Sequence, residues 1–432
     1  MHIKSLHLQN FRCFEEATFE FLPGFNLLIG ENGAGKSSVL DAIKESLVEW
    51  NPTISSDTTF TAKKDIRIEL SKNAKGNQWE SKRPFSCKAI YDVVEYEDDT
   101  TTELESLTVI DGQVVFGLKK SGHSINTFFE KTFNKQEVTI PLNVVFRVDR
   151  LPTRGVSEVD VRLLIDKKNT ITDGFVNSVD QKINIKEMVE WIVSKSLGRA
   201  LGGFDHKINT IDDDLSVVRM AILSCVDGCE SIYYVHNGGG LAISWEGGAI
   251  GTFDNLSDGQ RLYIAMVADI ARRACLINPR LGNKVLEETP GIVLIDELDL
   301  HLHPKWQRSI VANLTKTFPK IQFIATTHSP QIIGECKPEQ VIIVTKKGGV
   351  RPPESFGMDS NAVLREIMGA DDRDKEVSEL IDKLFSEIDE RKLTAARASL
   401  QKLRAKASNL AEIIEAEHLI ERFSHDNPRA AE

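Results

Sequence analysis

The sequence predicts an α/β fold whose two halves lie far apart in the chain. Three observations predict it. Residues 25–29 (FNLLI) form an apolar run typical of a buried strand, and a glycine-rich loop and an amphipathic helix follow. Residues 251–345 alternate helical patterns with apolar runs, which is typical of a parallel sheet covered by helices. Between the halves, residues 51–250 are first rich in strand patterns and then mixed, so we expect an insertion there.

The first half begins with strand patterns that precede the glycine-rich loop. Leu6 and Leu8 alternate with polar residues, and Phe19 and Phe21 do the same. After the loop, apolar residues at helical spacing predict a helix over about 36–48. In the insertion, strand patterns occupy 65–148, helical patterns lie near 185–197 and 217–225, and a hairpin is expected over 232–245 with a turn at Asn237. The second half is expected to contain helices over 259–276 and 305–316 and strands over 291–296, 322–327 and 341–344.

The composition is that of a globular protein with an acidic balance. The chain has 432 residues, 41% of them hydrophobic, which excludes a fibrous or disordered protein and allows a large core. It carries 53 Lys and Arg against 64 Asp and Glu, a formal net charge of −11. Such a charge gives no general attraction to nucleic acid, so contact with DNA would need a local basic surface or a second protein.

The cysteines and the first residues favour the cytoplasm. No apolar signal segment starts the chain and no stretch of about 18 apolar residues occurs, so we expect a cytoplasmic protein without a membrane partner. Most of the six cysteines stand singly among apolar residues. Cys225 and Cys229 form a single pair without a second one, which is a poor zinc framework. Reduced, buried thiols are the favoured interpretation.

Residues 30–37 (GENGAGKS) fit the phosphate-binding pattern G-x-x-x-x-G-K-[ST]. The strand before it and the helix after it are the context that this pattern requires. Glycines let backbone N–H groups curl around phosphates, and the helix N-terminus favours an anion. We expect Lys36 to reach the β- and γ-phosphates of ATP and Ser37 to ligate Mg²⁺. The expected ATP-binding residues of this loop are Gly30, Asn32, Gly33, Gly35, Lys36, Ser37 and Ser38.

A second acidic site ends the apolar run 292–295. Asp296 and Glu297 follow four apolar residues, and carboxylates at the C-terminal edge of a buried parallel strand face the ligand crevice of an open α/β sheet. We predict that Asp296 helps Ser37 to hold Mg²⁺ and that Glu297 is the general base that activates water.

Residues 256–260 (LSDGQ) are expected to begin a helix, and they indicate which class of ATPase the sequence resembles. Together with the two sites above they resemble the signature of ABC ATPases, from which Asp258 departs at one position. In that family the signature of one subunit faces the ATP of another. The resemblance therefore implies a homo-oligomer with an ATP sandwich, in which Ser257, Gly259 and Gln260 contact the nucleotide. His328, at the end of the strand over 322–327, matches the switch histidine of that family.

The segment after Glu297 allows two interpretations. Asp299, His301 and His303 lie where ABC ATPases have the D-loop, and we interpret Asp299 and His301 as coupling residues at the subunit interface. The alternative is that His301 and His303 bind a metal together with His328, but a catalytic zinc would compete with the Mg²⁺ site.

The opening of the chain resembles RecF, SMC and OLD-type ATPases, whose strand-end motif is matched by Asn10-Phe11-Arg12. That resemblance places Arg12 near the nucleotide, and residues 146–150 lie where such ATPases have a nucleotide-sensing strand end, although no Q-loop glutamine can be assigned. Residues 256–344 and the C-terminal part are similar to the PtuA ATPases of Septu and retron anti-phage systems. This similarity implies a separate HNH endonuclease partner of the PtuB type, higher oligomers, and DNA contact through the complex.

The sequence thus predicts a P-loop ABC-type ATPase with a split nucleotide-binding domain. We expect a first lobe with the phosphate loop over 1–150, an insertion of helices and a hairpin over 151–250, the signature and acidic strand over 251–350, and a helix–turn–helix interaction module over 351–432. The main alternative is a RecF- or SMC-like DNA-repair ATPase that binds DNA directly. It would need a basic track, and the sequence offers only scattered lysine pairs. A transporter ATPase subunit would be more compact.

Overall fold

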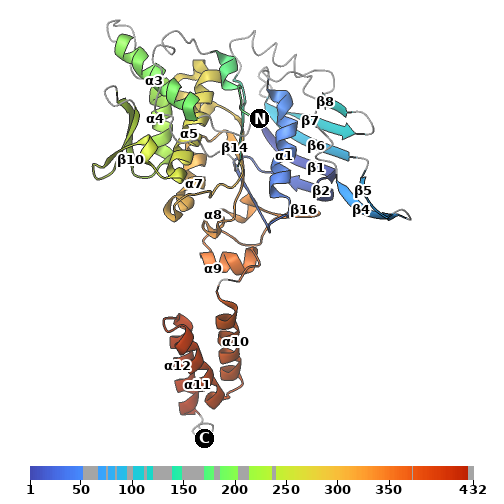
Figure 1. Cartoon of the computed structure of the whole chain (residues 1–432), viewed down its shortest axis with the longest axis vertical. Coiled ribbons are helices and arrows are strands. Elements are labelled where there is room, and N and C mark those ends of the chain that lie inside the picture. The colour runs from blue at the N-terminus through green and yellow to red at the C-terminus, as the bar shows by residue number, and fades with distance from the viewer. Residues whose placement is uncertain are drawn as a thin grey trace. The chain divides into compact units, whose positions relative to one another are not determined.

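A computed structural model shows how the two halves combine (Figure 1). It describes residues 1–51, 67–73, 76–82, 85–94, 101–110, 114–119, 139–147, 170–179, 185–202, 214–235, 240–371 and 373–426. The chain forms two compact units, Met1–Asp359 and Ser360–Glu432, which are described separately below. Each helix in the described ranges is either too short or too polar to span a lipid bilayer.

The first unit is built on one mixed sheet of eleven strands in the order β8-β7-β6-β1-β2-β16-β15-β3-β14-β13-β9. The two halves of the chain therefore meet inside a single sheet. The strands are β1 (His2–Phe11), β2 (Phe14–Glu20), β3 (Phe25–Ile29), β6 (Phe85–Val94), β7 (Thr101–Ile110), β8 (Val114–Lys119), β9 (Leu142–Phe146), β13 (Gly291–Ile295), β14 (Ile321–Thr326), β15 (Val341–Thr345) and β16 (Gly348–Val350).

The centre of the sheet is parallel and buried. β15, β3, β14, β13 and β9 are neighbours with parallel pairing, and every residue of β3, β9, β13 and β14 is buried. Strands buried on both faces read as continuous apolar runs, which is why FNLLI and GIVLI were recognisable. Their C-terminal ends all lie at one edge of the sheet, because the strands run the same way.

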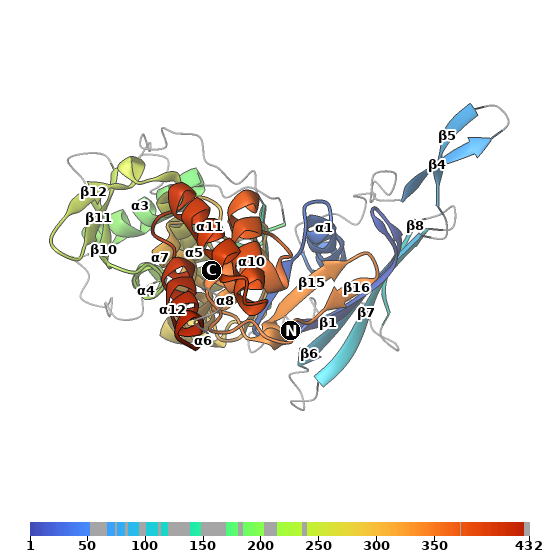
Figure 2. The same cartoon turned by 90° about the horizontal axis from the view of Figure 1, so that it is seen from below.

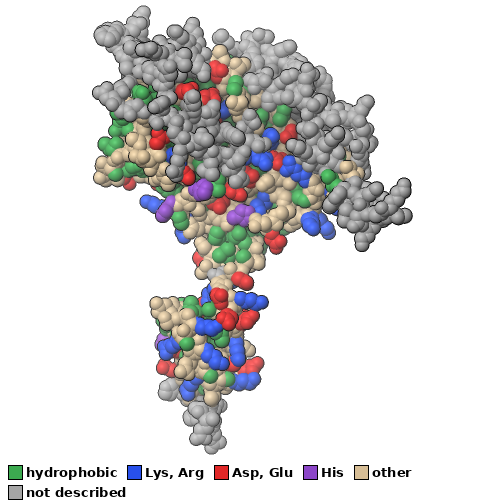
Figure 3. All heavy atoms as spheres, viewed as in Figure 1, with side chains coloured by type: hydrophobic (Ala, Val, Ile, Leu, Met, Phe, Trp, Pro, Cys, Tyr) green, Lys and Arg blue, Asp and Glu red, His purple; other side chains and the backbone are tan. Residues whose placement is uncertain are grey.

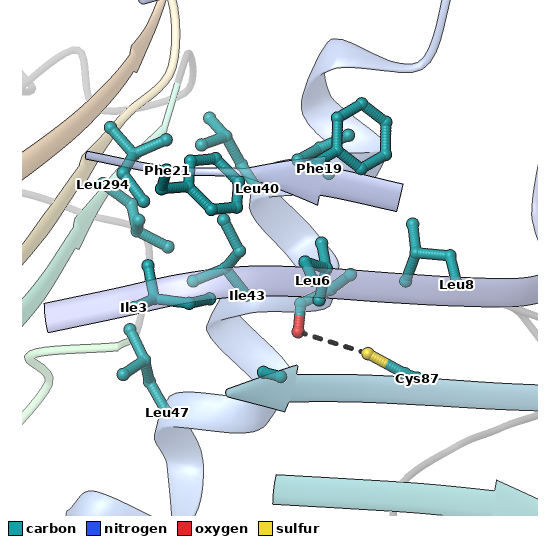
Figure 4. Close-up of a cluster of buried hydrophobic side chains, with 14 of the residues drawn as sticks. Ile3, Leu6, Leu8, Phe19, Phe21, Leu40, Ile43, Leu47, Cys87 and Leu294 are labelled. Atoms are coloured by element: carbon teal, nitrogen blue, oxygen red, sulfur yellow. Dashed lines mark hydrogen bonds between the residues drawn. The ribbon is translucent and has the colours of Figure 1, made fainter. Parts of the chain in front are cut away.

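The antiparallel part of the sheet packs on helix α1 (Lys36–Leu47). β6 pairs with β1 and β7 with β6, so strands of the predicted β-rich region extend the sheet of the phosphate loop. Figure 4 shows the core between α1 and these strands, where Leu40 and Ile43 lie near Ile3 and Leu6. Cys87 is buried there, and its thiol donates to the carbonyl oxygen of Ala42 over 3.8 Å. A further hairpin, β4 (Ile68–Asn73) with β5 (Gly76–Ser81), forms a separate two-stranded sheet.

Several helices of the first unit gather on the side away from β6, β7 and β8 (Figure 2). They include α3 (Ile185–Gly202), α4 (Asp214–Cys225), α5 (Asp258–Ile277) and α7 (Pro304–Thr317). The predicted hairpin is present as β10 (Cys229–Val235) paired with β11 (Gly240–Trp245), and β12 (Ile250–Thr252) pairs with the other edge of β11. The predicted turn at Asn237 lies outside the described residues. Trp245 stacks on Trp306 with ring centroids 6.2 Å apart, which ties this small sheet to α7. The remaining short elements of this unit are η1 (Val48–Trp50), η5 (Ile171–Gly174), η6 (Phe253–Asn255), η7 (Pro279–Lys284), α6 (Val285–Glu288), α8 (Pro330–Gly334) and η8 (Pro338–Gln340).

A buried charge network fixes α5 to its neighbours. Asp269 accepts hydrogen bonds from Arg272 and Arg273 at 2.9 and 2.7 Å, and Arg273 also donates to the carbonyl oxygen of Gly174 at 2.8 Å. Burial opposes ionisation of Asp269, but the two guanidinium groups outweigh it and lower the pKa of this carboxyl. The helix that begins with LSDGQ is therefore held rigidly within the first unit.

The second unit is a bundle of three helices, not the predicted helix–turn–helix. α10 (Lys375–Asp389), α11 (Leu393–Lys406) and α12 (Ala411–Asp426) enclose their own apolar core, preceded by the short turns α9 (Ser360–Ala362) and η9 (Val363–Ile367). The apolar residues after position 390 lie on two helices instead of one, because the chain is not helical between Lys406 and Ala411. Charged side chains of both signs cover the visible face of this unit in Figure 3.

Candidate functional site

The predicted phosphate loop joins β3 to α1 in a conformation that needs glycine. Gly30, Gly33 and Gly35 have φ angles of 145°, 81° and 107°, a region that residues with a Cβ rarely adopt. A Cβ on Gly35 would also lie 2.4 Å from Cζ of Phe14 and 2.7 Å from Sγ of Cys13. The loop is therefore shaped both by its own backbone and by the β1–β2 turn beside it. Of the other expected loop residues, Asn32 is exposed and Ser38 half-buried.

Lys36 folds back over the loop. Its Nζ donates to the carbonyl oxygens of Gly30 at 2.8 Å and Glu31 at 3.0 Å, and the residue is buried. Burial lowers the pKa of this ammonium, while the carboxylates of Asp296 and Glu297 and a third one nearby act in the opposite direction. The Lys36 ammonium is thus held by the backbone of the phosphate loop, near the carboxylates of Asp296 and Glu297.

The acidic strand end meets the phosphate loop at Ser37. Its hydroxyl lies 3.3 Å from Oδ1 of Asp296, although the two residues are far apart in the chain. Asp296 is buried, and the Thr326 hydroxyl at the end of β14 donates to the same Oδ1 at 2.7 Å. The sequence-predicted pair of Ser37 and Asp296 is therefore brought together in the structure. Thr326, which the sequence reasoning missed, orients the carboxylate.

Glu297 bends away from the sheet in an uncommon conformation. Its φ angle is 51°, in the left-handed region that a few per cent of non-glycine residues occupy. The bend is fixed because the Glu297 amide donates to the Thr326 hydroxyl at 2.7 Å. The amide of Leu298 donates to the carbonyl oxygen of Thr326 at 2.8 Å. Strain at a half-buried carboxylate beside a phosphate loop is typical of functional sites.

Asp299 ties the segment after Glu297 to His328. Its Oδ1 accepts hydrogen bonds from the Thr327 hydroxyl at 2.5 Å and from the His328 amide at 3.2 Å. The His328 side chain is exposed at the end of β14. Ser329 caps α8 and donates to Oε1 of Gln307 on α7 at 2.7 Å. The backbone around the predicted switch histidine is therefore fixed, and its side chain is exposed.

The LSDGQ segment is a well-capped helix start. Ser257 is the N-cap of α5; its Oγ accepts from the Gln260 amide at 3.3 Å, and its own amide donates to Oε1 of Gln260 at 3.0 Å. Asp258, the departure from the usual signature, forms an ion pair with Arg261. In the described part of the chain, the hydrogen bonds of Ser257 and Gln260 stay within this cap and do not reach the phosphate loop.

Gly259 lies directly against the segment after Glu297. A Cβ on Gly259 would be 1.9 Å from the carbonyl oxygen of His301, so only glycine permits this contact. His301 itself has a φ of 57°. The predicted coupling residues Asp299 and His301 thus connect the His328 backbone on one side to the start of α5 on the other.

Arg12 is held by a buried carboxylate that the sequence reasoning missed. Arg12 and Arg147 each place Nη1 on a different oxygen of Asp41, which lies on α1. Only 8% of the Asp41 side chain is exposed. One signal for Asp41 was present in the sequence, a charged residue on the apolar face of the helix predicted over 36–48. Its arginine partners could not be predicted, because they follow strands that are distant in the sequence.

The alternative metal site at His301, His303 and His328 receives no support. Within the ranges that the structure covers, no group of three or more His, Cys, Asp or Glu side chains could hold a metal ion. The Nδ1 of His303 instead accepts from the amide of Lys305 at 3.2 Å and caps α7. All six cysteines are free, and all but Cys13 are buried.

A phosphate loop joined to two strand-end carboxylates, with a histidine ending the neighbouring strand, defines a P-loop ATPase. Residues 25–334 match the family described as "AAA domain, putative AbiEii toxin, Type IV TA system". This match spans most of the chain, and the chain belongs to that family.

The resemblance to retron and Septu ATPases is confirmed by two relatives. "Retron Ec83 probable ATPase" of Escherichia coli is 25% identical over 432 residues, which cover 85% of this chain and 76% of the relative. "Septu protein PtuA" of Bacillus thuringiensis is 24% identical over 340 residues, covering 77% of this chain and 72% of the relative. Among solved structures, the SMC head domain from Thermotoga maritima is 14% identical, with a TM-score of 0.44, over 81% of this chain and 99% of that one.

Proposed function

We propose that the chain hydrolyses ATP at the phosphate loop and that Glu297 is the general base. The observation that carries this proposal is the junction of Ser37 and Asp296, whose oxygens lie 3.3 Å apart beside a buried lysine. Lys36 exchanges its contacts with the Gly30 and Glu31 carbonyls for the phosphates of ATP. The N-terminus of α1 adds a favourable field for the same anion.

The donor set fits Mg²⁺. Hydroxyl and carboxylate oxygens are the ligands this ion prefers, and Ser37 and Asp296 provide one of each. When bound there, Mg²⁺ neutralises charge on the phosphates of ATP. Thr326 keeps the Asp296 carboxylate in one orientation by donating to it at 2.7 Å.

Glu297 and His328 act on the water and the terminal phosphate. The Thr326 hydroxyl accepts from the Glu297 amide and donates to the Asp296 carboxylate, which fixes the Glu297 backbone directly after Asp296. The Glu297 carboxylate accepts a proton from the attacking water. His328 projects from the adjacent strand end and contacts the phosphate that is released. Removing a general base typically slows a reaction about 10²- to 10⁴-fold.

We further propose that two chains complete each site. Ser257 is exposed at the positive end of the 20-residue helix α5, and its helix start makes no contact with its own phosphate loop among the described hydrogen bonds. In the ABC family the signature serves the ATP of a second subunit. Ser257, Gly259 and Gln260 are thus assigned to the nucleotide of the partner chain.

The biological setting comes from the relatives. Because relatives named for retrons and for Septu match most of the chain, we propose that this ATPase acts in anti-phage defence, in the cytoplasm, and controls an HNH endonuclease of the PtuB type. Contact with DNA would then occur through the complex, which suits the net charge of −11. Co-purification of an HNH endonuclease encoded beside this chain tests the partnership, and its failure to bind would contradict it.

The direct test of the proposed chemistry is Glu297→Gln. The amide keeps the shape of the side chain but cannot take a proton from water, so we expect ATP turnover to fall about 10²- to 10⁴-fold while ATP binding is retained. Turnover is measured by phosphate release and binding by calorimetry. The matched control is Glu339→Gln, because Glu339 is exposed on η8 and distant from this chemistry in sequence. Equal turnover in Glu297→Gln and wild type would show that Glu297 is not the base.

A further inference from the structure

The turn that carries His328 is held by hydrogen bonds on both sides of the histidine. Oδ1 of Asp299 accepts from the Thr327 hydroxyl at 2.5 Å and from the His328 amide at 3.2 Å. The amide of Ser329 donates to the Thr327 hydroxyl oxygen at 3.0 Å. Thr327 and Ser329 are buried, whereas His328 is exposed. The turn therefore exposes one histidine between two buried, hydrogen-bonded residues.

Gln307 on α7, which lies beside α8 (Figure 1), closes this network from a third element. The Ser329 hydroxyl donates to Oε1 of Gln307 at 2.7 Å, and Nε2 of Gln307 donates to the carbonyl oxygen of Leu302 at 2.9 Å. The amide of Leu302 donates to the carbonyl oxygen of Asp299 at 3.0 Å, which returns the path to its first residue. The hydrogen bonds thus form a closed ring, which we call the Gln307 ring, made of Asp299, Thr327, Ser329, Gln307 and Leu302.

The chemistry of glutamine suits its place in the ring. A carbonyl oxygen only accepts, so the Leu302 carbonyl orients the Gln307 amide with Nε2 toward itself and Oε1 toward Ser329. The Ser329 hydroxyl can donate to Oε1 while its oxygen accepts from the Ile332 amide at 3.3 Å. Gln307 lies near the start of α7, and side chains of a helix lean toward its N-terminus, which brings the amide back to Leu302. One side chain thus links two segments that are distant in the sequence.

The ring joins the two segments that carry the proposed catalytic side chains. Asp299 comes shortly after Glu297, and His328 lies between two members of the ring. Misplacing reacting groups by about 1 Å can slow a reaction on the order of 10²-fold. The ring therefore restrains the backbone from which both Glu297 and His328 project.

We propose that Gln307 is a positioning residue for ATP hydrolysis, which holds the His328 turn against the segment after Glu297. The inference rests on the proposed function and deepens it by adding a side chain of α7. Gln307 acts through the Leu302 carbonyl and the Ser329 hydroxyl, and it takes no part in proton transfer. Its loss should reduce kcat, because the two segments are then no longer held together.

Gln307→Met tests this role in the full chain by phosphate release at varied ATP concentration. Methionine has nearly the length of glutamine but lacks its amide, so kcat should fall about tenfold to a hundredfold. The KM for ATP should stay near the wild-type value, because Lys36 is held by the phosphate loop itself. The matched control is Asn313→Leu. Asn313 lies on the same helix and donates to the carbonyl oxygen of Cys225 at 3.0 Å and to Oδ1 of Asp227 at 3.2 Å.

The control removes comparable hydrogen bonds outside the ring. Asn313→Leu should therefore keep the wild-type kcat, even where thermal unfolding shows a lower melting temperature. If Gln307 were merely structural, Gln307→Met would lower the melting temperature in the same way and leave kcat unchanged. A kcat loss in Asn313→Leu as large as that in Gln307→Met would also refute the positioning role.

Thr327→Val breaks the ring at a second point. Valine keeps the branched shape of threonine without its hydroxyl, so kcat should again fall with little change in KM. If the ring acts as one unit, the double variant with Gln307→Met should lose no more kcat than the weaker of the two single variants. Multiplied losses in the double variant would contradict the ring. Should one single variant fail to fold, the other decides by its kcat.

His328→Ala distinguishes failure of this inference from failure of the proposed function. If His328→Ala turns over ATP like wild type, the role proposed for His328 is wrong, and the role of Gln307 is wrong with it. If His328→Ala loses kcat while Gln307→Met and Thr327→Val keep the wild-type value, the positioning role alone is refuted.

Discussion

At the residue scale, a single hydroxyl contacts both acidic residues that follow β13. Thr326 donates to Asp296 at 2.7 Å and accepts from the Glu297 amide at 2.7 Å, so one side chain orients the carboxylate that we propose for Mg²⁺ and the backbone of the proposed general base. The left-handed conformation of Glu297 costs about 1–3 kcal/mol and persists because these contacts determine it. The acids are thus oriented before any nucleotide arrives.

Cys13 lies beside the phosphate loop, so the rate at which its thiol is alkylated can be used to detect nucleotide binding there. It is the exposed cysteine, and its Sγ would lie 2.7 Å from a Cβ on Gly35. Partial burial raises the pKa of this thiol, so its reactive thiolate forms at a higher pH than in a free cysteine. We expect slow alkylation by iodoacetamide near pH 7, faster alkylation as the pH rises above 9, and protection by ATP with Mg²⁺. Mass spectrometry of the modified peptide measures this.

The buried Cys225 provides the internal control for this alkylation. Burial raises its pKa to about 12, so it should stay unmodified across the same pH range with or without ATP. Alkylation of Cys13 at the same rate in the presence and absence of saturating ATP would contradict the placement of the nucleotide at this loop.

Sequence reasoning could identify the candidate site residues that form contiguous motifs. Gly30, Lys36, Ser37, Asp296 and Glu297 all follow apolar strands, and the structure brings the loop and the acids together. Residues whose role depends on contacts with segments distant in the sequence could not be predicted from local motifs. Asp41 and Thr326 look like ordinary polar residues in the sequence, because their importance depends on which strands become neighbours. The expectation that Cys13 is a buried thiol was wrong, because its side chain lies at an exposed turn.

At the scale of elements, the start of α5 and the segment after Glu297 are in direct contact. Gly259 packs on the His301 backbone, and Asp299 in the same segment holds the His328 amide. We therefore expect a shift at the strand end that carries His328 to reach the start of α5 through these backbone contacts. Such a connection would join the two faces of one subunit in the proposed ATP sandwich.

Gly259→Ala tests this connection. A Cβ 1.9 Å from a backbone oxygen forces the helix or the segment to move, which we expect to cost about 1–3 kcal/mol of unfolding free energy. ATP turnover should fall at least tenfold because the Asp299 contacts shift with the segment. The matched control is Gly251→Ala, since a Cβ on Gly251 meets nothing within 4 Å. Urea unfolding and phosphate release measure both effects, and wild-type stability and turnover in Gly259→Ala would contradict the coupling.

The elements themselves were predicted unevenly, for physical reasons. Strands buried on both faces and the amphipathic helix α1 have strong patterns, and their boundaries agree closely with the structure. The joining of β6 to β1 was not foreseen, because antiparallel pairing between distant strands leaves no local pattern. The three-helix bundle was taken for two helices because its apolar spacing continues through the break between α11 and α12.

At the scale of the whole molecule, the chain is an ATPase unit followed by a separate bundle. Each has its own apolar core, Met1–Asp359 around the eleven-stranded sheet and Ser360–Glu432 around Leu384, Leu403 and Ile420. The phosphate loop after β3 and the acidic residues after β13 come together within the first unit, because only β14 lies between these two strands. Among the described hydrogen bonds, those of Ser257 and Gln260 do not reach the phosphate loop of the same chain, and we propose that they serve the nucleotide of a second chain.

The most direct test of this account is the mass of Glu297→Gln with ATP. We expect light scattering after gel filtration to show that ATP with Mg²⁺ doubles the mass of the particle found with ADP, because ATP that is not hydrolysed keeps two chains closed. Adding Ser257→Arg should abolish the change by placing a bulky side chain at the signature. If Glu297→Gln binds ATP and its mass remains that of the ADP state, the proposed sandwich is contradicted.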